Sequence, residues 1–224
     1  MTQMPPLKYR IFILIIFAVL LVLNTFTGWG LPITNTSHCL IDSTFTNTED
    51  INSFLTRFKD KYIQNPILIT ITLLSDGLFI FSLIQWVNNS KTYRFIWTIV
   101  ALYATKMFFG LLFRLRLPSG YLLSYPGVPS LTISYLTTNS FFFNGTIGLL
   151  TILAKEFYYT QKEFVMLMSI FDILVLGSSL IFLRGNYCID LLFGVFFGDF
   201  IDELFRRGIF KKKKENNKIL NNSI

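Results

Sequence analysis

The stretch FVMLMSIFDILVLGSSLIFL, residues 164–183, decides the fold class, because only one of its twenty side chains, Asp172, is ionisable. Twenty residues of α-helix measure about 30 Å, the thickness of the hydrocarbon core of a bilayer. Such a run predicts a helix that crosses a membrane. The whole chain has the same character: 52% of its 224 residues are apolar and 15% are charged. We therefore expect an all-α, polytopic membrane protein.

Five further apolar runs extend this expectation to a bundle of six transmembrane helices. The six predicted spans cover residues 11–29, 67–87, 94–113, 140–159, 164–183 and 189–205. Each should be helical, because a helix satisfies its own backbone hydrogen bonds in lipid and no strand-like alternation is present. Residues 1–205 are thus interpreted as one membrane domain, followed by a basic tail at 206–224.

The first outer loop is predicted to hold an amphipathic helix at about residues 49–62. The sequence Thr46-Asn47-Thr48-Glu49 matches a capping box, and apolar residues follow it at helical spacing. Whether this helix contacts lipid or protein is left open by the sequence.

Charge predicts the orientation of the chain. The tail holds seven Lys and Arg against one Glu and so supplies +6 of the net charge of +7. In the six-span arrangement, 13 Lys and Arg lie on the side of the two termini and six on the other side. Both termini should therefore face the cytosol or, in a mitochondrion, the matrix. A basic tail beside apolar spans is typical of a topology determinant or a lipid-surface patch, so nucleic acid is not an expected partner.

Ionisable residues inside the predicted spans are functional candidates, because burying a charge in lipid is costly. Asp76 and Lys106 fall at one depth on consecutive helices, which predicts a buried ion pair between them, with a proton or ion path as the alternative. Asp172 has no predicted partner. Gly194 and Gly198 form a Gly-x-x-x-Gly pair, which predicts close helix packing.

Two short motifs lie at the predicted outer ends of the fourth and sixth spans. The first is Asn144-Gly145-Thr146-Ile147-Gly148, preceded in the chain by Tyr125-Pro126-Gly127-Val128-Pro129-Ser130, and the second is Arg184-Gly185-Asn186-Tyr187-Cys188-Ile189-Asp190. Together they resemble the sphingomyelin synthase-like branch of the lipid phosphatase/phosphotransferase superfamily. The resemblance covers roughly residues 65–205 and implies six helices, cytosolic termini and an outward-facing site.

The resemblance also implies a chemistry, in which one His attacks phosphorus, an Asp orients it, and a second His exchanges protons with the leaving and entering groups. The family motifs read Ser-Gly-His-Thr/Val-Gly and Arg-Gly-His-Tyr-x-Ile-Asp. This chain has Asn144 at the Ser position, Thr146 and Asn186 at the two His positions, and keeps only Asp190. Neither an amide nor a threonine hydroxyl shuttles protons near neutral pH. The single histidine, His38, lies in the first outer loop, so we expect a pseudoenzyme without catalytic residues.

A site without catalysis can still bind a lipid headgroup. Its expected ligands are Arg184, Asn144, Asn186 and Tyr187, since helix N-termini and Arg attract phosphate. Alternatively, Arg184 only snorkels to the headgroups. With one His and two Cys, no metal site is expected, and a bound phospholipid is the only cofactor considered. A disulfide between Cys39 and Cys188, both on the outer side, is left open.

These observations predict a non-catalytic accessory or scaffold subunit of a larger membrane complex, with membrane lipids and other subunits as its partners. The composition indicates an AT-rich genome, where repurposed enzymes often become extra respiratory-chain subunits, so we favour the mitochondrial inner membrane, with the ER or Golgi as alternative. The competing hypotheses are an active lipid phosphotransferase or phosphatase with an unusual site, and a lipid translocator.

Overall fold

Helices make up all the regular structure that the computed structural model describes. The described residues are 9–16, 19, 42–57, 61–89, 92–112, 121–123, 125–133 and 143–221. Their elements are α2 (Ser43–Asn47), α3 (Glu49–Arg57), α4 (Lys61–Asn89), α5 (Arg94–Leu112), α6 (Gly145–Tyr159), α7 (Glu163–Phe182) and α8 (Cys188–Asn221). The predicted all-α class is thus confirmed. Of the first predicted span, residues 11–16 and 19 are helical and the others lie outside the described residues.

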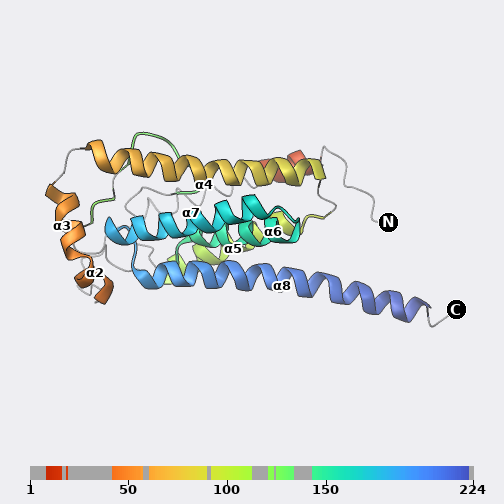
Figure 1. The fold of residues 1–224 in the computed structure, drawn as a ribbon. Coiled ribbons are helices and arrows are strands. Elements are labelled where there is room, and N and C mark those ends of the chain that lie inside the picture. Colours follow the sequence, from red (N-terminus) through yellow and green to blue (C-terminus); the bar gives the residue numbers. More distant parts are fainter. Residues whose placement is uncertain are drawn as a thin grey trace.

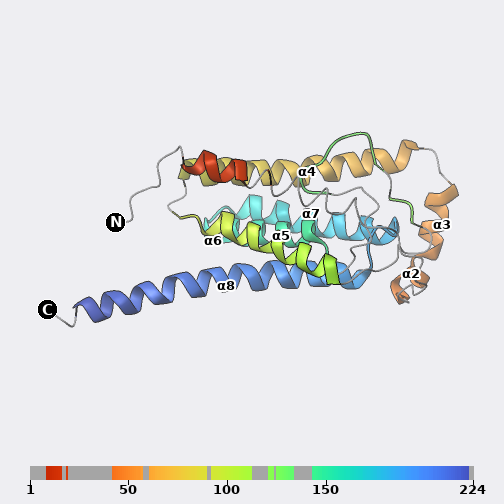
Figure 2. The same cartoon turned by 180° about the vertical axis from the view of Figure 1, so that it is seen from behind.

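The long helices α4 to α8 lie alongside one another, with α2 and α3 across one end of the bundle (Figure 1). The view from behind shows the helical segment of residues 9–16 beside α4 (Figure 2), where the Arg10 guanidinium donates to the carbonyl of Val87. At the end opposite α2 and α3, α8 projects beyond the other helices. The basic segment predicted as a separate tail therefore begins as a continuation of α8, which runs to Asn221.

The other predicted spans correspond to helices with shifted ends. Residues 67–87 lie within α4, while α5 and α7 match their predicted ranges to within one residue at each end. α6 begins at Gly145, later than predicted, because Asn144 caps it. Within the described residues, two helices are long and apolar enough to cross a membrane, namely Pro66–Asn89 of α4 and Glu163–Phe182 of α7. The expected six-span bundle is therefore not confirmed.

The core of the molecule is α6, in which residues 145–154 are all buried. The backbones of α6 and α8 approach closely where α8 has glycine. A Cβ placed on Gly194 would lie 2.7 Å from the carbonyl oxygen of Asn144, and one on Gly198 would lie 2.5 Å from that of Gly148. The predicted close packing at the Gly-x-x-x-Gly pair is confirmed.

The inward face of α7 mixes polar and apolar side chains, whereas its outward face is apolar. Its buried residues are Ser169, Asp172, Leu176 and Leu180. Phe164 and Leu174, by contrast, are 75% and 65% exposed. Contiguous apolar surface of this kind is typical of contact with lipid or with another protein.

Candidate functional site

The two motifs meet where α6 and α8 begin. Asn144 caps α6, since its side-chain oxygen accepts the backbone N–H of Ile147 at 3.0 Å. Its amide nitrogen donates to the side-chain oxygen of Asn186 at 3.1 Å. The backbone N–H of Asn144 also donates to the carbonyl of Asp190 at 2.9 Å. The structure thus brings together two of the motif positions that sequence analysis singled out, from segments 42 residues apart.

Asp190 completes this polar cluster. Its Oδ2 accepts the backbone N–H of Tyr187 at 3.0 Å and lies 3.4 Å from the amide nitrogen of Asn186. The carboxyl group is fully buried, and its Oδ1 has no hydrogen-bond donor among the described residues. Asn144, Asn186 and Asp190 therefore form a connected chain, which we call the outer cluster.

Thr146 does not belong to the outer cluster, although it occupies the first histidine position of the resemblance. Its hydroxyl donates to the backbone carbonyl of Thr132 at 2.5 Å. This bond ties α6 to the loop of residues 130–133, and so the Thr146 side chain has a structural contact away from Asn186.

Asp76 holds the same loop from the other side. Its carboxylate accepts the hydroxyls of Ser130 and Thr132, at 3.1 and 2.6 Å, and the backbone N–H groups of Leu131 and Thr132, at 2.9 and 3.0 Å. No ion pair joins Asp76 to Lys106 in the part of the chain that the structure describes. The predicted pair is therefore corrected: four neutral donors satisfy Asp76, while the Lys106 side chain packs against Gly145.

The predicted headgroup ligands Arg184 and Tyr187 lie against α2. The Arg184 guanidinium is 5.4 Å from the centre of the Phe45 ring and 3.4 Å from the Phe45 carbonyl oxygen. Tyr187 is 1% exposed, and its ring lies 5.6 Å from that of Phe45. Sequence reasoning missed Phe45, which covers both residues and leaves little of Tyr187 for a ligand.

Asp42 joins α2 to the start of α8. Its carboxylate caps α2 through Thr44 and accepts the backbone N–H of Cys188 at 2.8 Å. Burial alone would disfavour the ionised form, but the hydrogen bonds from Thr44 and Cys188 outweigh burial and hold the pKa of Asp42 below its ordinary value. The sequence signal for this contact is Asp42-Ser43-Thr44, a helix-capping pattern. His38 and Cys39 lie outside the described residues. The disulfide between Cys39 and Cys188 is therefore not tested.

The opposite end of the bundle holds a network of charges, which we call the inner cluster. Arg94 of α5 donates to the fully buried Asp202 of α8 at 2.7 Å and pairs with Glu156 of α6. Arg206 bonds the same two acids, at 2.7 Å to Asp202 and 3.2 Å to Glu156. Lys155 lies 2.6 Å from Asp199 and 3.8 Å from Asp202. Sequence reasoning counted these three cations only as indicators of orientation and missed their pairing.

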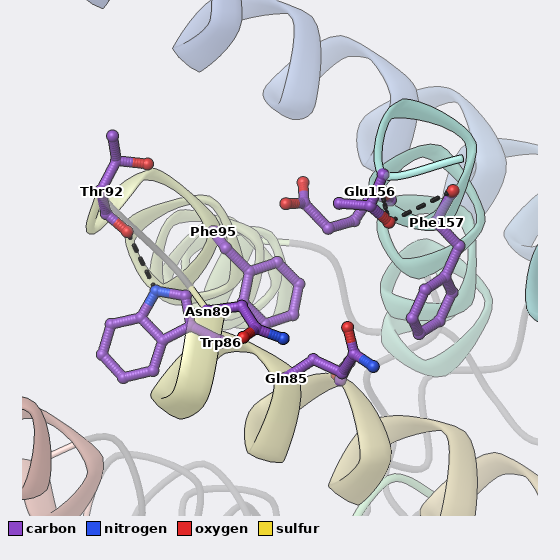
Figure 3. Close-up of a pocket in the computed structure, with 9 residues that line it drawn as sticks. Gln85, Trp86, Asn89, Thr92, Phe95, Glu156 and Phe157 are labelled. Atoms are coloured by element: carbon purple, nitrogen blue, oxygen red, sulfur yellow. Dashed lines mark hydrogen bonds between the residues drawn. The ribbon is translucent and has the colours of Figure 1, made fainter. Parts of the chain in front are cut away.

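A cleft of about 240 Å³ lies next to the inner cluster. Figure 3 shows Gln85 of α4, Phe95 of α5 and Glu156 of α6 around one space. Trp86 also lines the cleft, and its indole N–H donates to the carbonyl of Thr92 at 3.0 Å. The remaining lining residues are Ser82, Asn89, Thr92, Phe157 and Thr160. Within the described ranges, no group of three or more His, Cys, Asp or Glu side chains is placed to hold a metal ion.

No family model, curated protein or solved structure matches this chain. The likeness to sphingomyelin synthases therefore stays a prediction from the two motifs.

Proposed function

We propose that this chain is a non-catalytic integral membrane subunit that serves as an accessory or scaffold in a larger membrane protein complex. The observation that carries the proposal is the state of the two positions where the resemblance places histidines. Thr146 donates to a backbone carbonyl, and Asn186 is bonded to Asn144 and lies beside Asp190. Neither side chain attacks phosphorus as imidazole does or transfers protons near neutral pH.

The outer faces of the helices support a role in a membrane assembly. Along α8, an apolar stripe recurs every three or four residues and is about half exposed: Ile189, Leu192, Phe196, Phe200 and Leu204. The outward residues of α7 form a second apolar face. Lipid tails and apolar surfaces of neighbouring subunits are the chemistries that suit such faces.

The finer parts of the proposal concern topology and location. We propose six spans with both termini on the cytosolic or matrix side, which the distribution of Lys and Arg supports. We propose the mitochondrial inner membrane as the location and a respiratory-chain complex as the assembly. The support is the composition, which indicates an AT-rich genome, where repurposed enzymes often become extra respiratory-chain subunits. A phospholipid held near the outer cluster is the proposed small ligand, with the positive charge supplied by Arg184.

Native purification tests this proposal. The chain, extracted from its own membranes in mild detergent, should migrate with a larger assembly whose subunits mass spectrometry identifies. Migration as a lone monomer would contradict the scaffold role.

Activity assays separate the competing functions. The purified chain should transfer no phosphoryl group from labelled phosphatidylcholine or phosphatidate, and it should move no lipid across proteoliposomes. Phosphotransfer above background that disappears in Asp190→Asn would establish the enzyme instead, because Asp190 is the only retained residue of the implied machinery.

A further inference from the structure

Asp172 is a buried carboxyl group that the outer cluster does not use. It lies in the middle of α7 and is fully buried. Its Oδ2 accepts the hydroxyl of Ser75 of α4 at 2.6 Å. Its Oδ1 is buried and has no hydrogen-bond donor among the described residues. One neutral hydrogen bond is therefore the whole of its described polar support.

In the part of the chain that the structure describes, no ion pair joins Asp172 to a Lys or Arg side chain. α7 packs chiefly against α2, α4 and α6, and its C-terminal half also meets Asn52 of α3 and Leu191 of α8. α2 and residues 145–154 of α6 contain no ionisable side chain. From α4, the nearest ionisable group is Asp76, the residue after Ser75, whose side-chain oxygens accept four hydrogen bonds from the loop of residues 130–133. On α7 itself, the other ionisable residue is Glu163, at the start of the helix.

An ionised Asp172 would thus be a buried negative charge beside a second one. A buried charge without a counter-ion is so costly that such groups normally take up a proton and become neutral. Asp202 is the contrasting case within the same chain. It is equally buried, but Arg94 and Arg206 each lie 2.7 Å from its oxygens and supply the counter-ions that Asp172 lacks among the described residues.

We propose that Asp172 is a proton-binding site between α4 and α7, occupied by a proton at neutral pH. The proton adds to Oδ1, and Oδ2 remains the carbonyl oxygen that accepts the Ser75 hydroxyl. Binding converts the carboxylate and one proton into a neutral carboxylic acid with no other bond made or broken. The ligand of this site is the proton itself, and the inference is independent of the proposed scaffold role.

Infrared spectroscopy of the full chain in liposomes tests the site, because a protonated carboxyl group has a carbonyl stretching band that a carboxylate lacks. At pH 7 the wild-type chain should show this band, and Asp172→Asn should lose the intensity of one carboxyl group per chain. Asp202→Asn is the matched control: it removes an equally buried aspartate and should leave the band unchanged. Ser75→Ala should keep the band and move it to higher frequency, because the carbonyl loses its hydrogen bond.

Three outcomes would overturn the proposal. The first is the absence of a protonated-carboxyl band at pH 7 in the wild-type chain. The second is a band that Ser75→Ala leaves at its frequency and Asp172→Asn leaves at full intensity. The third is a band that appears only when Na⁺ is removed, since the site would then bind a metal cation. Ser75→Ala also keeps the test decisive if Asp172→Asn does not fold, because it leaves the carboxyl group in place.

Discussion

Replacing Gly198 by alanine should separate α6 from α8. The new Cβ would lie 2.5 Å from the carbonyl oxygen of Gly148 and 3.0 Å from both the Cα of Gly148 and the Cβ of Thr151. Non-bonded carbons normally lie roughly 3.5–4.0 Å apart, so the contact requires a shift of at least about 0.5 Å. Two of the three atoms belong to the backbone of α6, and hence no change of rotamer relieves the clash.

Gly77→Ala is the matched control for this substitution. A Cβ at Gly77, in α4, would have no atom within 4 Å. Both variants gain roughly 1 kcal/mol from the higher helix propensity of alanine, so this gain cancels when they are compared. The remaining difference is the strain caused by the new side chain at position 198. We expect it to lower the free energy of unfolding by about 3 kcal/mol, the upper end of the usual range for overpacked cores, because the backbone must move. The two variants should therefore differ about 100-fold in their unfolding equilibrium constants.

Reversible unfolding in mixed micelles, followed by tryptophan fluorescence, measures this difference. Gly177→Ala is a second control, since its nearest neighbour would be Cδ1 of Leu191 at an ordinary 3.8 Å. It should behave like Gly77→Ala. Equal stability of Gly198→Ala and the two controls would refute the reasoning, because the helices would then not approach as closely as the glycine contacts require.

Three further substitutions test the clusters at the two ends of the bundle. Asp202→Asn should destabilise the chain by roughly 3–5 kcal/mol, because Arg94 keeps a buried charge with one partner fewer; an unchanged thermal midpoint would contradict this. Asn186→Ala should lower the free energy of unfolding by roughly 1–3 kcal/mol, because groups of the outer cluster lose their hydrogen-bond partner. Amide hydrogen exchange at the start of α6 should become faster, and unaltered exchange would count against the cluster. Asp42→Asn should speed exchange of the Cys188 amide at pH 7. The folded-state pKa of Asp42 is lowered, so its stabilisation is present above its ordinary pKa and fades as pH falls through the lowered value; a difference from wild type that persists in strong acid would argue against this origin.

The helices were predictable where apolar length alone determines them, as in α5 and α7. Their ends were less so, because capping depends on local hydrogen bonds. α6 begins at Gly145, five residues after the predicted beginning of that span, and the capping bond from Ile147 to Asn144 carries no apolar signal. The sequence also does not show where α8 ends, since the basic residues after Phe205 form helices as readily as apolar ones.

The outer cluster was partly predictable, because the motif positions Asn144 and Asn186 do lie together. The Asp76–Lys106 pair failed for a geometric reason. Residue counting gives the depth of a side chain in the bilayer, but not the direction in which it leaves its helix. Asp76 instead faces the loop of residues 130–133, whose donors the sequence did not reveal as a binding surface for a carboxylate.

Glycine contacts and interhelical hydrogen bonds join the helices of this molecule beside an extensive apolar core. Close packing and interhelical hydrogen bonds matter most where helices face lipid, because an apolar side chain gains little there by facing inward. Here these are the glycines of α8 and the bond from Ser75 to Asp172. Leu174→Ala, which truncates an outward side chain of α7, should accordingly lower the free energy of unfolding in a bilayer far less than Gly198→Ala does. If Leu174→Ala proves the more damaging in the isolated chain, burial would outweigh these contacts, and α7 would not face lipid.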